Sequence, residues 1–188
     1  MRSMTATALP SGLSWEQFLE LLEQDEYKNA ELIDGRVVVV TPSWLHQRIV
    51  VGLLRLIGNW ISAGQDRGEV TFNPRVQITH NRGYLPDVAW YRGDRVHVDA
   101  TAPEGPPDLA VEVLSPSSRS FDLVRKRADY ARIGVHELWL IDPEEPAVIV
   151  LRREGAEFVV VDDLERDGGL TSPLLPGLEI VVGGLVAL

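Results

Sequence analysis

The sequence predicts an α/β protein in which a mixed β-sheet is flanked by helices. Residues 43–64 carry apolar side chains at helical spacing, which predicts a long amphipathic helix. Residues 108–115 alternate apolar side chains between two faces, as a strand does. A helical segment at 120–133 and a further strand at 137–142 follow. A strand–helix–strand order of this kind favours a parallel strand pair with a right-handed crossover.

Turn and cap signals divide the rest of the chain into elements. Ser14 and Gln17 have the spacing of a capping box, which predicts that a helix begins there. Asp34-Gly35 is a favoured two-residue turn and predicts a β-hairpin. Gly64 and Gly134 are expected to end the two longer helices. Further strands are expected between Gly, Pro and Asn turns, at 69–79, 86–92, 147–152, 158–161 and 178–182.

The composition is that of an ordinary globular protein. The 188 residues are 45% hydrophobic and 24% charged, and the chain is long enough to bury one core. It has no cysteine, which excludes disulfides and thiolate metal sites and favours an intracellular protein. No apolar run approaches the roughly 20 residues of a membrane helix. We therefore expect a cytoplasmic protein with a flexible tail over 1–13 and a single domain over 14–188.

The charge is strongly negative but unevenly distributed. A net charge of −10 argues against a protein that binds nucleic acid over its whole surface. The acids are concentrated at 14–35 and 136–188, whereas residues 115–135 hold five bases and two acids. This basic segment is compatible with a local phosphate-facing patch. A solvated helix face would have the same composition.

Two carboxylates, Asp87 and Glu112, lie in apolar, strand-forming segments. A buried charge costs free energy unless it is paired or binds a metal. If the two strands are neighbours, about 4.8 Å apart, the carboxylates can come within reach of one cation. Carboxylate oxygens are ligands that suit Mg²⁺. The alternative for Glu112 is a buried acid paired with an arginine.

The residues around these acids form a longer pattern. Glu112 follows Asp87 by 25 positions and lies within the segment Asp-Leu-Ala-Val-Glu-Val-Leu-Ser-Pro-Ser at 108–117. This pattern resembles the Uma2 family, restriction-endonuclease-like proteins of the PD-(D/E)XK nuclease superfamily. The resemblance extends over roughly residues 30–145 through Glu31-Leu32-Ile33-Asp34-Gly35, His46, Pro86-Asp87-Val88, Asp122, Lys126, Tyr130 and 134–139.

The resemblance implies a restriction-endonuclease-like core that hydrolyses phosphodiester bonds with a divalent metal, usually Mg²⁺, for which Mn²⁺ can substitute. It makes Asp87 and Glu112 the metal ligands and catalytic acids. The superfamily has a lysine two positions after the second acid, but this chain has Leu114 there. The family pattern moves the lysine to the following helix, so Lys126 becomes the third catalytic candidate. The alternative for Lys126 is a surface ion pair with Asp122, four positions earlier.

The weaker candidates are Glu31, His46, Asp122 and Tyr130, and each has a plain structural alternative, which for Asp122 is the ion pair with Lys126. Glu31 is a further acid for the metal or an edge-strand surface charge, and His46 is a ligand or a boundary histidine of the long helix. Tyr130 continues the helical row of Asp122 and Lys126, and it is equally a packing residue. The tryptophans at 60, 90 and 139 fit apolar faces and are expected in the core.

Two functions follow from these observations. The first is a Mg²⁺-dependent endonuclease, with DNA as the expected substrate and a homodimer as the expected assembly, since cutting both strands suits a twofold-symmetric enzyme. The second is a catalytically degenerate nuclease fold that acts as a binding or protein-interaction module. The net charge and Leu114 favour the second, and the two carboxylates with Lys126 favour the first.

Overall fold

The computed structural model describes residues 10–39, 41–96, 103, 105–115 and 119–187, without the side chains of Arg119, Asp122 and Val186. The chain forms two compact units. The first comprises residues up to Thr41 together with Arg75–Leu85, and the second comprises Pro42–Pro74 and Pro86–Leu188. A single domain over 14–188 stays a prediction.

The first unit is a small antiparallel sheet with a short helix. Its strand order is β2-β1-β5-β4. The Ser14–Gln17 capping box is present, as predicted. In the hairpin turn, Asp34 and Gly35 both have positive φ, at 50° and 74°, as a type I′ turn requires. The elements are α1 (Trp15–Leu21), a 3-10 turn (Asp25–Tyr27), β1 (Ala30–Ile33), β2 (Arg36–Val39), β4 (Val76–Thr79) and β5 (Arg82–Tyr84).

The predicted tail over 1–13 is described only from Pro10 onward, and residues 1–9 lie outside the described part of the structure. Pro10 O accepts a hydrogen bond from Val37 N at 3.2 Å, and Leu13 N donates to Gly35 O at 3.0 Å. Residues 10–13 are therefore bonded to the hairpin of the first unit. Whether a flexible tail precedes them stays a prediction.

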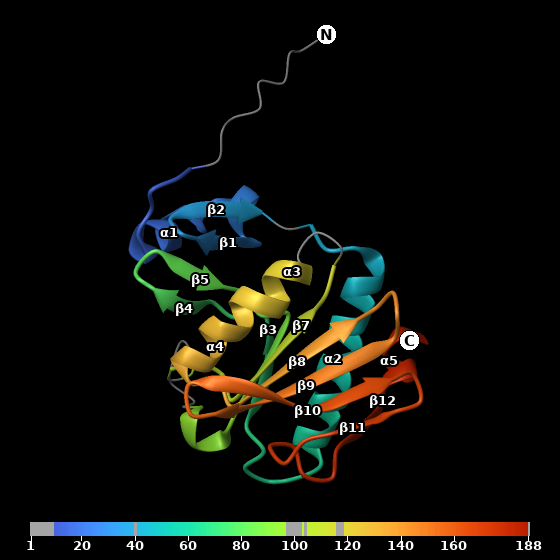
Figure 1. Ribbon diagram of the computed structural model, residues 1–188. Coiled ribbons are helices and arrows are strands. Elements are labelled where there is room, and N and C mark those ends of the chain that lie inside the picture. The colour runs from blue at the N-terminus through green and yellow to red at the C-terminus, as the bar shows by residue number, and fades with distance from the viewer. Residues whose placement is uncertain (1–9, 40, 97–102, 104, 116–118, 188) are drawn as a thin grey trace. The chain divides into compact units, whose positions relative to one another are not determined.

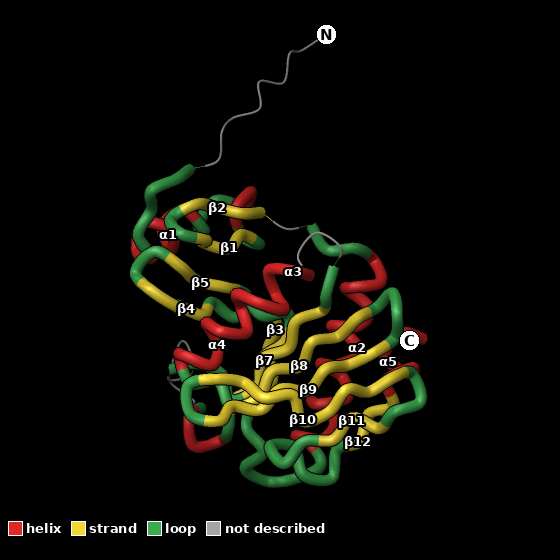
Figure 2. The backbone as a smooth tube through the Cα atoms, viewed as in Figure 1, coloured by secondary structure: helices red, strands yellow, loops and turns green. Residues whose placement is uncertain are grey.

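The second unit contains a six-stranded mixed sheet in the order β10-β9-β8-β7-β6-β3. β7 and β8 are parallel, as predicted, and the other neighbours are antiparallel. Figure 2 shows β7 and β8 side by side in the middle of this sheet. The strands are β3 (Glu69–Phe72), β6 (Val88–Tyr91), β7 (Leu109–Val113), β8 (Glu137–Asp142), β9 (Ala147–Glu154) and β10 (Glu157–Glu165).

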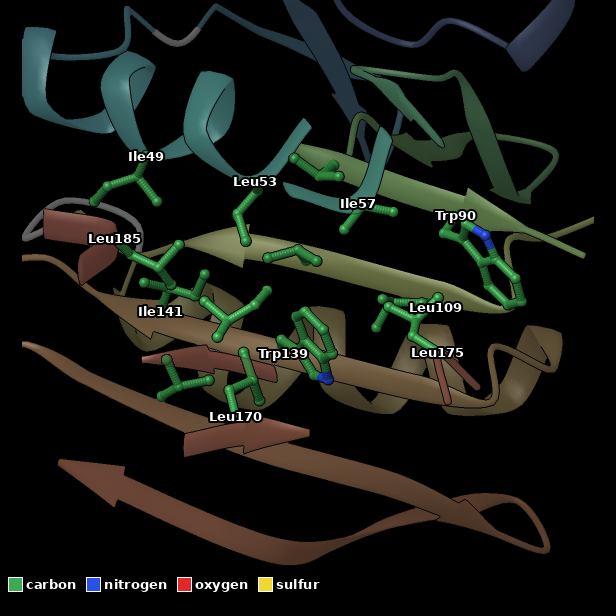
Figure 3. Packing of buried hydrophobic residues seen from close by; sticks show 14 of the residues in the cluster. Ile49, Leu53, Ile57, Trp90, Leu109, Trp139, Ile141, Leu170, Leu175 and Leu185 are labelled. Atoms are coloured by element: carbon green, nitrogen blue, oxygen red, sulfur yellow. The ribbon is translucent and has the colours of Figure 1, made fainter. Parts of the chain in front are cut away.

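Helices cover both faces of the six-stranded sheet (Figure 1). On one face, α2 (Trp44–Ser62) and α5 (Val182–Ala187) pack on the central strands with β11 (Gly169–Thr171) and β12 (Glu179–Val181). The alternation of β7 puts Leu109, Val111 and Val113 into this core, where the predicted core tryptophans 60, 90 and 139 are also buried. Figure 3 shows Ile49, Leu53 and Ile57 directed from α2 toward the strands in this cluster. On the other face, α4 (Arg127–Ile133) covers the strands.

The expected strand over 69–79 is wrong as one element. The structure divides it into β3 in the second unit and β4 in the first. The break falls at Asn73-Pro74, where Asn73 has a φ of 48°. Because Pro74 has no amide hydrogen and Asn73 leaves the extended region, the ladder cannot continue through this dipeptide.

The helix expected over 120–133 is present but irregular. It begins as α3 (Arg119–Phe121), widens into a π-helical segment at Asp122–Lys126, and continues as α4 until Gly134, whose φ of 102° ends it. The sequence predicted the glycine end and not the π-helical segment. None of the helices in the described ranges is long and apolar enough to cross a membrane.

Candidate active site

Glu112 is a buried carboxylate in the middle of the six-stranded sheet. It lies on β7, on the opposite face from Leu109, Val111 and Val113, and its side chain is 4% exposed. The strands on both sides, β6 and β8, remove it from water and fix its backbone. A carboxylate in this position requires strong donors, since an unpaired buried charge is very unfavourable.

The helix packed on that face supplies two of these donors. Lys126 Nζ lies 3.0 Å from Glu112 Oε2, and the lysine side chain is 7% exposed. Tyr130 donates its hydroxyl to Glu112 Oε1 at 2.7 Å. The two residues are four positions apart and therefore lie on one side of the helix. A surface ion pair was the alternative for Lys126, and it is wrong, because the ammonium is buried beside Glu112.

The π-helical segment determines how Lys126 is presented. It ends at Lys126, immediately before the regular α4 that carries Tyr130. A π-helical turn contains an extra residue compared with an α-helical turn, so it rotates the residues on its two sides relative to each other. Segments of this kind are frequent at functional sites. Here it lies directly beside a buried Lys–Glu pair.

Asp87 lies at the start of β6, directly beside Glu112 in the sheet. Val88 pairs with Val111, so continuing the same antiparallel register places Asp87 opposite Glu112. Asp87 Oδ2 accepts a hydrogen bond from Val113 N at 2.7 Å and so takes the place of a strand carbonyl at the end of the ladder. The condition that the sequence prediction made, that the two strands are neighbours, is met, although β6 itself begins at Val88, one residue after Asp87.

His46 on α2 contacts the same carboxylate. Its Nε2 lies 2.8 Å from Asp87 Oδ1, and both side chains are 16% exposed. Ser43 caps α2 by accepting from His46 N at 3.2 Å, which fixes the helix start three residues before the histidine. The imidazole therefore orients Asp87 from a rigid helix. A boundary histidine satisfied by a carboxylate would make the same contact, so the part of His46 in the site stays a prediction.

The donor set fits a divalent cation with few protein ligands. Glu112 on β7 and Asp87, directly before the neighbouring β6, offer carboxylate oxygens, and Mg²⁺ commonly takes one or two carboxylates together with water and phosphate oxygens. Within the described residues, no group of three or more His, Cys, Asp or Glu side chains is placed to hold a metal ion. A cation bound here would therefore depend on water and substrate for most of its coordination.

The two remaining sequence candidates are Glu31 and Asp122. Glu31 belongs to the first unit, where its Oε1 accepts from Leu85 N at 3.1 Å, and it is 7% exposed. It is therefore wrong to regard Glu31 as an exposed edge charge. Asp122 lies in the π-helical segment, and its side chain is outside the described residues.

The basic run beside the site is not a uniformly solvated helix face. Lys126 is buried, Arg127 donates to Phe158 O at 2.6 Å, and Arg125 lies 5.8 Å from the ring centre of Phe121. These three cationic side chains therefore have partners within the protein. The basic composition of 115–135 is therefore only partly a surface property.

Comparison with known proteins agrees with this arrangement. A family model with the description "Uma2: Putative restriction endonuclease" matches residues 15–183. The chain belongs to the Uma2 family. No curated protein matches it. The match spans both acids, Lys126 and Tyr130, so the group described above lies wholly within the Uma2 region.

A solved structure shows the same fold. The crystal structure of a "putative nuclease belonging to DUF820 from Anabaena variabilis ATCC 29413" superposes with a TM-score of 0.76, at 22% identity, over 93% of this chain and 98% of that chain. The mixed α/β fold predicted from the sequence, a sheet flanked by helices with a restriction-endonuclease-like core, is confirmed. At this identity the likeness establishes the fold of this Uma2 protein.

Proposed function

We propose that this protein is a divalent-metal-dependent endonuclease that acts on DNA, with its active site at Asp87, Glu112 and Lys126. The observation that carries the proposal is the pairing of Lys126 with Glu112, at 3.0 Å, on a strand whose neighbour, β6, begins directly after Asp87. Two acids and an ammonium in one group supply what phosphodiester hydrolysis needs. These are ligands for a cation and a positive charge beside the reacting phosphate.

Each residue has a distinct role in this proposal. Asp87 and Glu112 would hold Mg²⁺ or Mn²⁺, which neutralises charge on the scissile phosphate and makes a water more acidic. Lys126 would position the attacking water or stabilise the transition state through its ammonium. Tyr130 and His46 are positioning residues, since each bonds one of the two carboxylates. Outer partners of this kind fix ligand orientation.

The direct test is nicking of supercoiled plasmid DNA with Mg²⁺ or Mn²⁺. The wild type should nick the plasmid, and Asp87→Asn and Glu112→Gln should each reduce the rate by about 10²-fold or more, because each removes a charged ligand of the cation that neutralises the reacting phosphate. Asp163→Asn is the matched control, since Asp163 is an exposed carboxylate on β10. Nicking that persists in both site variants would contradict the assignment.

His46 offers a test of the positioning role. His46→Ala should weaken Mn²⁺ binding by about 10–100-fold, because Asp87 loses the imidazole that orients it. The affinity is measured by isothermal titration calorimetry, alongside the unfolding midpoint. Asn59→Ala, an exposed change near the end of the same helix, should leave both unchanged. Equal Mn²⁺ affinity in wild type and His46→Ala would show that the histidine is only structural.

A second function is a catalytically inactive binding module with the same fold. Two observations favour it. Lys126 and Tyr130 already bond both oxygens of Glu112, and Leu114 is buried where the superfamily has its lysine. Calorimetry separates the two functions, since an active site should bind Mn²⁺ and lose that binding in Glu112→Gln. A wild type that binds neither Mn²⁺ nor Mg²⁺ supports the module.

A further inference from the structure

The outer face of α2 carries exposed apolar side chains that the rest of the second unit does not cover. The inner face of this helix, with Ile49, Leu53 and Ile57, is fully buried in the core. On the opposite side, Trp44 is 75% exposed and Val51 is 64% exposed. A tryptophan exposed to this extent is uncommon on a solvated surface and frequent in protein interfaces.

A shallow hollow of about 300 Å³ lies on this outer face. Six residues of α2 line it, namely Trp44, Gln47, Arg48, Val51, Gly52 and Arg55. We call this set the α2 outer strip.

The charge of the strip is opposite to that of the chain as a whole. Residues 35–65 contain no Asp or Glu, although the chain carries a net charge of −10. α2 carries Arg48 and Arg55, both on the strip. An arginine can stack on a tryptophan face, as Arg67 does on Trp60 in this chain, with 4.6 Å between the guanidinium carbon and the ring centre. The strip therefore holds both partners of a cation–π pair.

The strip is complementary to itself. Its six residues are placed symmetrically about the midpoint between Ile49 and Val50. Two copies of α2 packed antiparallel about that midpoint would therefore place Trp44 opposite Arg55, Arg48 opposite Val51, and Gln47 opposite Gly52. In this register no arginine faces an arginine, whereas a parallel pairing of the strips would bring like residues together.

We infer that the α2 outer strip binds a second copy of this chain, with the two α2 helices antiparallel across a twofold axis. Each Trp44 stacks on Arg55 of the second copy, so the cation–π pair occurs twice. Two helix faces of about three turns form a small interface, so the dimer is weak and concentration-dependent. The inference does not depend on nuclease activity, because its test measures mass and not cleavage.

The test is sedimentation equilibrium of the full chain over a wide concentration range, without nucleic acid. The wild type should form a dimer. Trp44→Ala and Val51→Lys should each raise the dimer dissociation constant by roughly tenfold or more, since the first removes the stacked ring and the second places a positive charge opposite Arg48 of the second copy. Each change occurs twice in the interface. Phe72→Ala is the control, because Phe72 is 61% exposed on β3, away from the strip, and its removal should leave the dissociation constant unchanged.

An exchange of the two paired residues tests the register. Trp44→Arg and Arg55→Trp should each weaken the dimer, and the double variant should restore it, because the stack forms again with the roles exchanged. A wild type that remains monomeric up to ~1 mM overturns the inference. So does a dimer unaffected by Trp44→Ala and Val51→Lys, or a double variant no stronger than the weaker of its two single variants.

Discussion

Gly68→Ala should lower the free energy of unfolding by about 3–5 kcal/mol, because two separate costs coincide at this position. Gly68 has a φ of +76°, a conformation that costs an alanine about 1–2 kcal/mol. A Cβ built there would lie 2.0 Å from the carbonyl oxygen of Tyr91, a backbone atom that cannot rotate away. Relieving that overlap requires moving the start of β3 away from β6.

Gly155→Ala is the matched control for this prediction. Gly155 also has a positive φ, of +64°, but a Cβ there would meet nothing within 4 Å. It should therefore cost only about 1–2 kcal/mol, the strain of the left-handed conformation alone. Urea unfolding of the two variants measures the difference. Equal losses of stability would show that the close approach at Gly68 contributes nothing.

The pairing of β7 with β8 could be predicted because its signals are local. Residues 109–113 alternate apolar side chains, Gly134 ends the intervening helix, and an apolar strand follows directly. Such signals fix the period and the ends of each element, and the right-handed crossover leaves few other arrangements. The neighbouring strand that begins after Asp87 was predicted for the same reason.

The features that the sequence did not reveal depend on contacts between distant residues. The π-helical segment has no local signal in the sequence. It lies where Lys126 meets Glu112, a residue 14 positions earlier, and only the folded chain shows that contact. His46 and Asp87 are 41 positions apart, so only the folded chain brings the imidazole to the acid. α5 contains Gly183 and Gly184, which disfavour a helix, and the burial of Val182 and Leu185 stabilises it nonetheless.

The break at Asn73-Pro74 is a different kind of miss, because its signal was local. Asn before Pro marks turns, and a proline within a strand pattern argues against one strand. The apolar and β-branched residues on both sides led to a single strand over 69–79. The dipeptide in fact divides β3 from β4, which belong to different sheets.

Lys126→Met should reduce the rate of plasmid nicking by about 10²–10³-fold, the usual effect of removing one group that stabilises transition-state charge. The methionine keeps a long side chain in the site and removes only the ammonium that lies 3.0 Å from Glu112 Oε2. The variant should also have a lower free energy of unfolding, because the buried carboxylate of Glu112 loses its paired cation. Nicking is therefore measured well below the unfolding midpoint of each variant.

Arg125→Met is the matched control, because it removes one positive charge from the same π-helical segment. Its nicking rate should fall far less, since its guanidinium lies near the Phe121 ring. Similar losses in both variants would indicate a general effect of charge on DNA binding. A wild-type rate in Lys126→Met would show that the helix lysine does not replace the one missing at Leu114.

The stronger form of this test moves the lysine back to the strand. Leu114 is 3% exposed, and the alternation of β7 directs its side chain to the same face as Glu112. A lysine there would place its ammonium beside Glu112 from the strand and not from the helix. We therefore expect Leu114→Lys, added to Lys126→Met, to recover at least about tenfold of the lost nicking rate, a fraction of what one charged group contributes.

If the double variant folds, binds Mn²⁺ and remains as inactive as Lys126→Met, then what matters is the direction from which Lys126 approaches. The π-helical segment would then be part of the catalytic apparatus.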